Sequence, residues 1–453
     1  MAGNFTIGEV FYGRELTQWN AMQRWNMAMM AMPNEDSRLG FFSKHGMVEQ
    51  TDIMQKSDAP IQMVRGLEGG GKQMTIYLRG FLSGEPSLVD ADGYAPPDDN
   101  TRRTLPQTEF SFQCTEWYGP PLYSATFKQS ADASTSIVGD YYQAISDYMA
   151  NLQDELAVIV LSGFRGEGQT NRVFNRQNAT PNQNAQSQVA GFTELMKQIN
   201  AVNTITAPTR LFSGQSATLS PNAALNAAGF LDHTADFNLT LPKLTNMQAY
   251  RANQKQGYAD WDLRPGTFTI MPDESNGEKV RKEGWTLIVS PEVARDMKNS
   301  SGTQNWYNHQ IAVAAAQAYK TGIPTGVVGM YSDTTILEYE RLSKYWAGAS
   351  ADVPVVRCLM MGAQSLVFGY QGKRMPEKFL PRGNNKMRHA IENWGTPFES
   401  WISGHDSERN ASLQYCFNLG MKKVQFEGPN FGGLQDRGLI AWDFSFSGSK
   451  LYA

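Results

Sequence analysis

The glycine-rich run Gly66–Lys72, GLEGGGK, is the stretch of this sequence that comes closest to a motif for chemistry. It fits the G-x4-G-K spacing of phosphate-binding loops, in which backbone N–H groups and a lysine hold the phosphates. Such a loop needs a serine or threonine after the lysine and then a helix, whereas Gln73 follows here and the next residues alternate as in a strand. A convincing strand before the loop is also missing. We therefore interpret the run as a glycine hinge, and keep a phosphate-binding α+β enzyme as the least favoured alternative.

The other residues that could do chemistry are scattered along the chain. The five histidines form no H-x3-H or HExxH pair, so no metal site is indicated. Cys114, Cys358 and Cys416 form no CxxC pair and lie in no nucleophile signature. Asp98 and Asp99 are adjacent carboxylates, but they fall in a stretch that we expect to be exposed, without the desolvated pocket that acid–base catalysis needs. The sequence predicts no catalytic residue, no metal and no cofactor, and hence a protein that is not an enzyme.

Composition limits the remaining classes of function. The 453 residues are 41% hydrophobic and 19% charged, which allows a sizeable core and argues against disorder. A net charge of −4 without a basic run argues against sequence-specific binding of nucleic acid. An odd number of widely spaced cysteines favours synthesis in a reducing cytoplasm. We find no signal peptide and no apolar run long enough to span a bilayer, so no membrane partner is expected.

The N-terminal residues 15–32 have apolar side chains at near-helical spacing and end at Pro33. Two interpretations stay open: a helix that docks on the core of its own subunit, or an arm that reaches a neighbouring subunit, for which adaptable methionines are well suited. The residues expected to make such a contact are Trp19, Met22 and Met29.

A long hairpin is predicted after the glycine run. Apolar and polar residues alternate after Lys72, and Thr108–Cys114 has the pattern of a return strand, with Phe110 and Phe112 on one face. More than twenty turn-forming and charged residues separate the two strands, and an isolated hairpin is marginal in water. We therefore expect another subunit to hold it. The charged residues predicted to contact neighbouring subunits are Asp98, Asp99, Arg102 and Arg103.

The rest of the chain mixes helices and strands. A continuous apolar stripe predicts a long helix over Ile137–Leu161, the spine of its domain. Cap residues before prolines predict helix starts at Ser220-Pro221, Thr240–Pro242 and Ser290-Pro291. Further elements are an alanine-rich helix at 306–320 and strands at 285–289, 334–340, 355–361, 365–370, 413–426 and 438–446. This order lacks regular βαβ alternation and favours the α+β class.

The order of elements and several strings resemble the HK97-type major capsid proteins of tailed phages, within the family typified by N4-like podophages. The strings are the entry into the strand from Gly71 to Leu82, WTLIVSPEVARDM (285–297), TGIPTGVVGMYSDTTILEYE (321–340), RCLMMGAQSLVFGYQG (357–372), FNLGMKKVQFE (417–427) and GLIAWDFS (438–445). Segments 166–188 and 230–284 depart from this pattern and are expected to be insertions.

The resemblance implies a domain plan: an N-terminal arm (1–60), an extended hairpin or E-loop (61–115), a peripheral domain with the spine helix (116–205), an axial domain with an insertion (206–374), and C-terminal strands that return to the peripheral domain (375–453). It also implies pentamers and hexamers of an icosahedral shell around double-stranded DNA, which the shell encloses without specific binding. The expected partners are copies of itself, a separate scaffolding protein, a portal and, as an open option, a decoration protein. Assembly would occur in the host bacterial cytoplasm, and the mature location would be the virion capsid. A tail or baseplate structural protein is the runner-up.

Overall fold

The architecture is taken from a computed structural model of the 453-residue chain. The residues that the structure describes are 40–51, 58–66, 73–79, 107–120, 122–124, 136–166, 203–214, 238–253, 264–270, 280–299, 306, 327–347, 353–371, 386–393, 396–404, 411–427 and 434–446.

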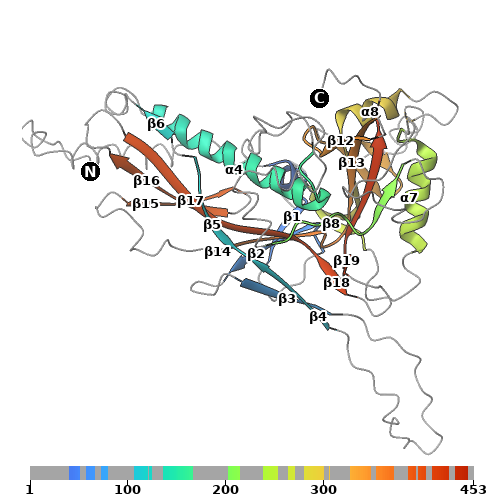
Figure 1. Ribbon diagram of the computed structural model, residues 1–453, viewed down its shortest axis with the longest axis horizontal. Helices are drawn as coiled ribbons and strands as arrows, with labels where there is room; N and C mark the ends of the chain where they lie inside the picture. The colour runs from blue at the N-terminus through green and yellow to red at the C-terminus, as the bar shows by residue number, and fades with distance from the viewer. Residues whose placement is uncertain are drawn as a thin grey trace, which may run out of the picture.

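The first sheet has eight strands among the described residues and extends along much of the molecule (Figure 1). Its main path, from one edge to the other, is β1 (Val48–Thr51), β2 (Ile61–Gly66), β14 (Leu366–Gln371), β17 (Ala411–Lys423), β16 (Thr396–Gly404) and β15 (Lys386–Asn393). Two short strands, β5 (Thr115–Tyr118) and β6 (Leu122–Ser124), also pair with β17. The β1–β2 and β2–β14 pairs are parallel and the others are antiparallel, so the sheet is mixed.

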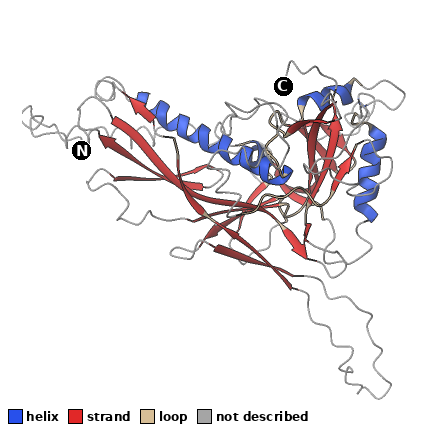
Figure 2. Ribbon diagram, in the orientation of Figure 1, coloured by secondary structure: helices blue, strands red, loops and turns tan. Residues whose placement is uncertain are grey.

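The second sheet also has eight described strands and carries two helices beside it (Figure 2). Its main path is β10 (Val327–Tyr331), β11 (Thr334–Glu338), β9 (Val280–Val289), β13 (Val353–Met361), β20 (Leu439–Ser445) and β7 (Leu211–Ser213). Two further strands pair with this path: β8 (Gly266–Ile270) with β9 and β12 (Lys344–Ala347) with β13. The helices are α7 (Leu241–Asn253) and α8 (Pro291–Lys298).

The predicted spine helix is confirmed as α4 (Ser136–Ser162), but its burial differs from the single apolar stripe expected from the sequence. Every residue from Leu152 to Ser162 is buried, including the polar side chains of Gln153, Asp154 and Glu155. The reason is the position of α4, which contacts strands of both sheets, β17 in the first and β13 in the second.

The predicted hairpin is present as β3 (Gln73–Arg79) and β4 (Gln107–Gln113), which pair with each other and extend away from the body of the molecule (Figure 1). A second small pair, β18 (Gln425–Glu427) and β19 (Leu434–Asp436), lies near its base. A four-residue helix, α2 (Phe41–Lys44), precedes β1 near the start of the described chain.

Local signals in the sequence gave mixed results. The Ser290 hydroxyl accepts a hydrogen bond from Val293 N and caps α8, with Pro291 at its first position, as predicted. The start near Thr240 is also confirmed, because α7 begins at Leu241. Ser220-Pro221 lies outside the described residues, as does the helix expected at 306–320 apart from Trp306. The β15–β16 hairpin was not predicted.

The strands near the C-terminus do not stay in one sheet. Strands β15, β16 and β17 belong to the first sheet, whereas β20 lies between β13 and β7 in the second. The domain boundaries drawn from the sequence stay predictions, and the last segment, 375–453, contributes to both sheets. The mixture of parallel and antiparallel strands agrees with the α+β class.

Candidate functional site

The base of the hairpin packs on its own subunit. In the β3–β4 register Met74 faces Phe112 and Ile76 faces Phe110, and all four side chains are buried. They form a second apolar cluster with Val64, Cys114, Val367, Val424 and Phe426. The expectation that another subunit must hold the hairpin is therefore wrong for its base, because strands β2, β14 and β18 supply the missing apolar partners.

Polar contacts also fix the body end of β4. The Asn203 side chain accepts a hydrogen bond from Gln113 N at 2.9 Å and donates one to Gln113 O at 2.8 Å, as a neighbouring strand would. Lys422 Nζ donates to Ser111 O at 2.8 Å and lies 5.1 Å from the centre of the Phe110 ring. The tip residues predicted to contact neighbours lie outside the described residues; they are Asp98, Asp99, Arg102 and Arg103.

The N-terminal residues predicted to contact neighbours, Trp19, Met22 and Met29, also lie outside the described residues. The described chain starts where the N-terminal segment meets the spine helix. Phe41 N donates a hydrogen bond to Asp154 Oδ2 at 2.6 Å, at the start of α2. The Phe41 ring also packs against Tyr339, with ring centres 4.4 Å apart. Burial raises the pKa of Asp154 to about 7, although the backbone N–H groups of Phe41 and Phe42 oppose this shift.

A buried ion pair holds the spine helix to the second sheet. Arg357 on β13 is 1% exposed and makes two hydrogen bonds to Asp443 on β20, at 2.8 and 2.9 Å. Arg357 also donates a hydrogen bond from Nη1 to Ser162 O at the end of α4 and stacks over the rings of Phe164 and Tyr345. Burial alone would lower the pKa of Arg357, but the Asp443 carboxylate raises it above the usual value. Tyr345 Oη donates to Asp443 Oδ2 at 2.8 Å, so both carboxylate oxygens are used.

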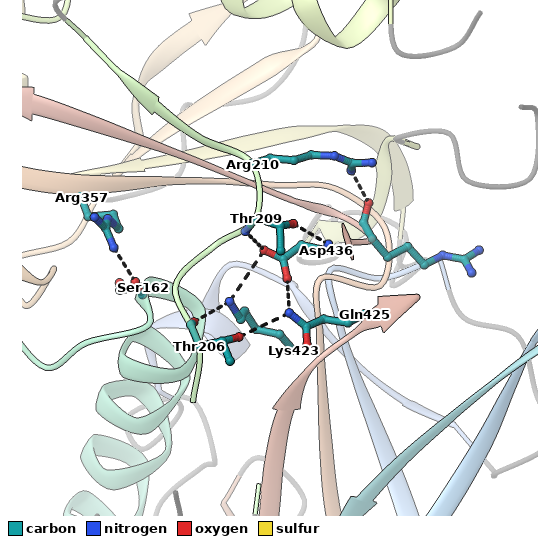
Figure 3. Close-up of polar contacts among 9 residues, drawn as sticks. Ser162, Thr206, Thr209, Arg210, Arg357, Lys423, Gln425 and Asp436 are labelled. Atoms are coloured by element: carbon teal, nitrogen blue, oxygen red, sulfur yellow. Dashed lines mark hydrogen bonds and ion pairs between the residues drawn. The ribbon is translucent and has the colours of Figure 1, made fainter. Parts of the chain in front are cut away.

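A second buried pair joins the two sheets through the segment 203–210 (Figure 3). Lys423 Nζ, at the end of β17, donates to Thr206 O at 2.7 Å and lies 3.7 Å from Asp436 Oδ2. Asp436 in turn accepts hydrogen bonds from Thr209 N at 2.7 Å and from Gln425 Nε2 at 2.8 Å. Because buried charges are stable only when paired and hydrogen-bonded, this cluster fixes the path of the chain between the sheets.

Features of reactive chemistry are weak in the described part of the chain. No three His, Cys, Asp or Glu side chains there are grouped so as to hold a metal ion. Burial raises the pKa of the Cys114 thiol to about 12 and raises that of Cys358 further, which keeps both thiols protonated and poorly nucleophilic at neutral pH. None of the described helices is long and apolar enough to cross a membrane.

The glycine run needs one correction. Strand β2 ends at Gly66, so a strand does precede the run, contrary to the sequence-based expectation. The residues that follow it form strand β3, however, and a phosphate loop requires a helix there. The following element therefore still argues against phosphate binding.

A family model described as phage capsid protein matches residues 28–409, most of the chain. The chain belongs to this family. No curated protein matches the sequence. As expected from the sequence, the protein is a capsid protein of the phage head shell.

Three of the solved structures similar to this phage capsid protein come from phage capsids or heads. The capsid protein of Ralstonia phage GP4 matches with a TM-score of 0.61 at 16% identity, over 99% of each chain. The capsid of cyanophage Pam1 matches with a TM-score of 0.52 at 16% identity, over 92% of this chain and 94% of that one. The head of Helicobacter pylori bacteriophage KHP40 gives 0.52 at 9% identity, over 92% and 93%. These likenesses confirm the HK97-type fold, whereas the N4-like subfamily stays a prediction.

Sequence reasoning missed the residues that position the hairpin of this capsid protein. Gly369, Gly420 and Asn203 each contact the body end of β4, yet none was singled out. Both glycines lie inside strings that carry the family resemblance, which was the available signal. Their role depends on which strands are neighbours, and that information was absent from the local pattern.

Proposed function

We propose that this phage capsid protein is the major subunit of an icosahedral head shell, in which it forms pentamers and hexamers around double-stranded DNA. The observation that carries the proposal is the hairpin, whose base is built into the subunit while β3 and β4 extend away from it (Figure 1). Among the described residues these two strands pair only with each other, which suits an element that reaches a neighbouring copy.

Two further features support a structural role. Arg357, paired with Asp443, also donates a hydrogen bond to the end of the spine helix, and Lys423, paired with Asp436, donates one to the segment that leads into β7. These contacts tie the helix and both sheets together, which suits a structural subunit. The net charge of −4 fits a shell that encloses DNA without binding it tightly. We infer that the protein is not an enzyme, that a separate scaffolding protein and a portal assist assembly, and that assembly takes place in the host cytoplasm.

The test is assembly of the full chain, alone and co-expressed with a scaffolding protein, followed by light scattering and electron microscopy. Closed shells or rings of five and six subunits are expected. A protein that stays monomeric at high concentration in both conditions would contradict the proposal. Thermal unfolding with and without ATP and Mg²⁺ separates the enzyme alternative, because only a nucleotide-binding protein would be stabilised.

A further inference from the structure

One face of the first sheet carries a row of residues without large side chains, just where β4 crosses it. Gly369 of β14 is paired with Val64 of β2 on one side and with Gly420 of β17 on the other. Cross-strand partners present their side chains on the same face of a sheet. The row Val64–Gly369–Gly420 is therefore flat over its two glycine positions, and we call it the hairpin seat.

The hairpin seat is in direct contact with β4. A Cβ atom added to Gly369 would lie 2.7 Å from Phe112 Cζ, and one added to Gly420 would lie 2.9 Å from the carbonyl carbon of Gln113. Both distances are shorter than carbon atoms tolerate. Phe112 is buried and Gln113 contributes backbone, so neither group can rotate away cheaply. Strand β4 can lie this close to the first sheet only because positions 369 and 420 are both glycine.

The next row of the same face guides β4 further along. Val367 is paired with Lys422, and Lys422 Nζ donates to Ser111 O and lies against the Phe110 ring. Phe112 therefore lies over the row that contains Gly369 and Gly420, whereas Ser111 and Phe110 are contacted by Lys422 of the next row. Together with the two hydrogen bonds between the Asn203 amide and the Gln113 backbone, these contacts fix the body end of β4 against the face of the first sheet.

We propose that the hairpin seat and the Asn203 amide set the direction in which the hairpin leaves the subunit, and that this direction determines whether copies close into a shell. The second half rests on the proposed function. Strand β3 has seven residues, and at about 3.3 Å per residue it spans about 23 Å. A tilt of about 10° at the seat would displace its far end by roughly 4 Å, more than a packed interface accommodates without loss of contacts.

Alanine substitution of Gly420 tests the seat in the full chain. Spin labels at Glu109→Cys and Asp147→Cys, both exposed, report the distance between the hairpin and the spine helix, while the native cysteines are buried. We expect Gly420→Ala to change this distance by a few ångströms and to form fewer closed shells or shells of altered diameter. Gly214→Ala is the matched control, because its Cβ would crowd Phe444 at 2.8 Å in the second sheet, away from the hairpin.

The following outcomes decide the proposal. An unchanged label distance in Gly420→Ala overturns the seat, and a changed distance with normal shells overturns its role in closure. If Gly420→Ala does not fold, Asn203→Ala serves instead, because it adds no bulk and is expected to change the same label distance. An unchanged label distance in Asn203→Ala would also overturn the seat. If the unsubstituted chain forms no shells at all, the proposed function fails, and the label distances alone still judge the seat.

A double variant distinguishes a steric clash at the hairpin seat from a general loss of subunit stability. Gly369→Ala crowds the Phe112 ring, and Phe112→Leu removes part of that ring. Under the proposal the double variant recovers the original label distance and normal shells, although each single variant departs from them. Two defects that add without recovery would overturn it.

Discussion

The two apolar clusters of the subunit differ in what they hold. The larger one joins α4, both sheets and helices α7 and α8, and it is crossed by the buried ion pairs. The smaller one comprises nine buried residues among those described, and it lies under the hairpin on the opposite face of the first sheet. Along β14 the alternation of side chains makes the division: Phe368 belongs to the large cluster and Val367 to the small one.

This difference assigns separate roles to the two regions. Loss of a contact in the large cluster is expected to lower the free energy of unfolding of the whole subunit. Loss of a contact around the hairpin is expected to leave most of the fold in place and to alter how copies meet. The predictions below are ordered by their expected effect on subunit stability.

Breaking the Arg357–Asp443 pair should have the largest effect. Arg357→Met leaves a buried carboxylate without its cation, which is expected to cost about 3–5 kcal/mol of unfolding free energy. Lys298→Met is the control, because Lys298 and Glu338 are 50% and 37% exposed, and loss of their ion pair should cost at most about 1 kcal/mol. Chemical denaturation of both variants measures the difference. Equal losses of unfolding free energy in the two variants would mean that burial of the Arg357–Asp443 pair does not increase the cost of breaking it.

Truncation in the spine helix should come next. Leu152 is 2% exposed, so Leu152→Ala removes buried methyl groups and leaves a cavity, at a cost of about 2–5 kcal/mol. Asp147→Ala on the exposed face of the same helix should change the unfolding midpoint little. If the two variants unfold at the same denaturant concentration, the large cluster does not depend on α4 in the way described.

The Asp154 carboxyl should give the subunit a pH-dependent stability. Its folded pKa, about 7, is raised above the ordinary value of 3.8, so between these values the folded state binds a proton that the unfolded state has lost. Stability from this group is therefore lost as pH rises from about 4 to about 7, by at most about 1.4 kcal/mol per pH unit. The groups that face Asp154 are the N–H groups of Phe41 and Phe42 and the side chains of Arg341, Glu155 and Tyr339.

Asp154→Asn removes the titration and keeps an oxygen that can accept from Phe41 N. Relative to the unsubstituted protein, the variant should gain stability as pH rises from 5 to 8, measured by denaturation at each pH. Parallel stability curves for the two proteins would show that Asp154 does not titrate in this range.

The sequence predicted those parts of the fold that depend on local patterns. The long helix α4, the alternation of β3 and β4 and the Ser290 cap are each indicated within a short window of sequence, and all three are confirmed. The sites that combine distant segments were not predictable. Arg357 meets Asp443, and Gly369 meets Gly420, only after the strands pair, and the composition of neither segment indicates its partner. The burial of Asp154 was missed for the same reason, because it depends on residues distant in the sequence, Phe41 and Phe42 of α2 and Tyr339 and Arg341 after β11.

The smallest effect on stability, and the largest on assembly, is expected at the hairpin tip. Asp98, Asp99, Arg102 and Arg103 are predicted from the sequence to meet charges on neighbouring copies. One exposed ion pair contributes about 0–1 kcal/mol, but shell symmetry repeats it at every interface. Arg102→Glu with Arg103→Glu should therefore leave the unfolding of the free subunit unchanged and reduce closed shells at low salt. Screening at high salt should restore part of them, because repulsion between exposed charges weakens with ionic strength.

A second double reversal separates contact at the tip from the change in net charge. Arg295→Glu with Lys298→Glu alters the net charge by the same amount on α8, where both side chains are about half exposed. If the tip mediates assembly, this variant forms shells at low salt and the tip variant does not. Loss of shells in both would trace the effect to total charge, since repulsion between whole subunits would act wherever the charges lie. Normal shells in both variants would show that the four tip residues do not contact neighbouring subunits. The hairpin, directed by the seat, would then contact a neighbour through other residues.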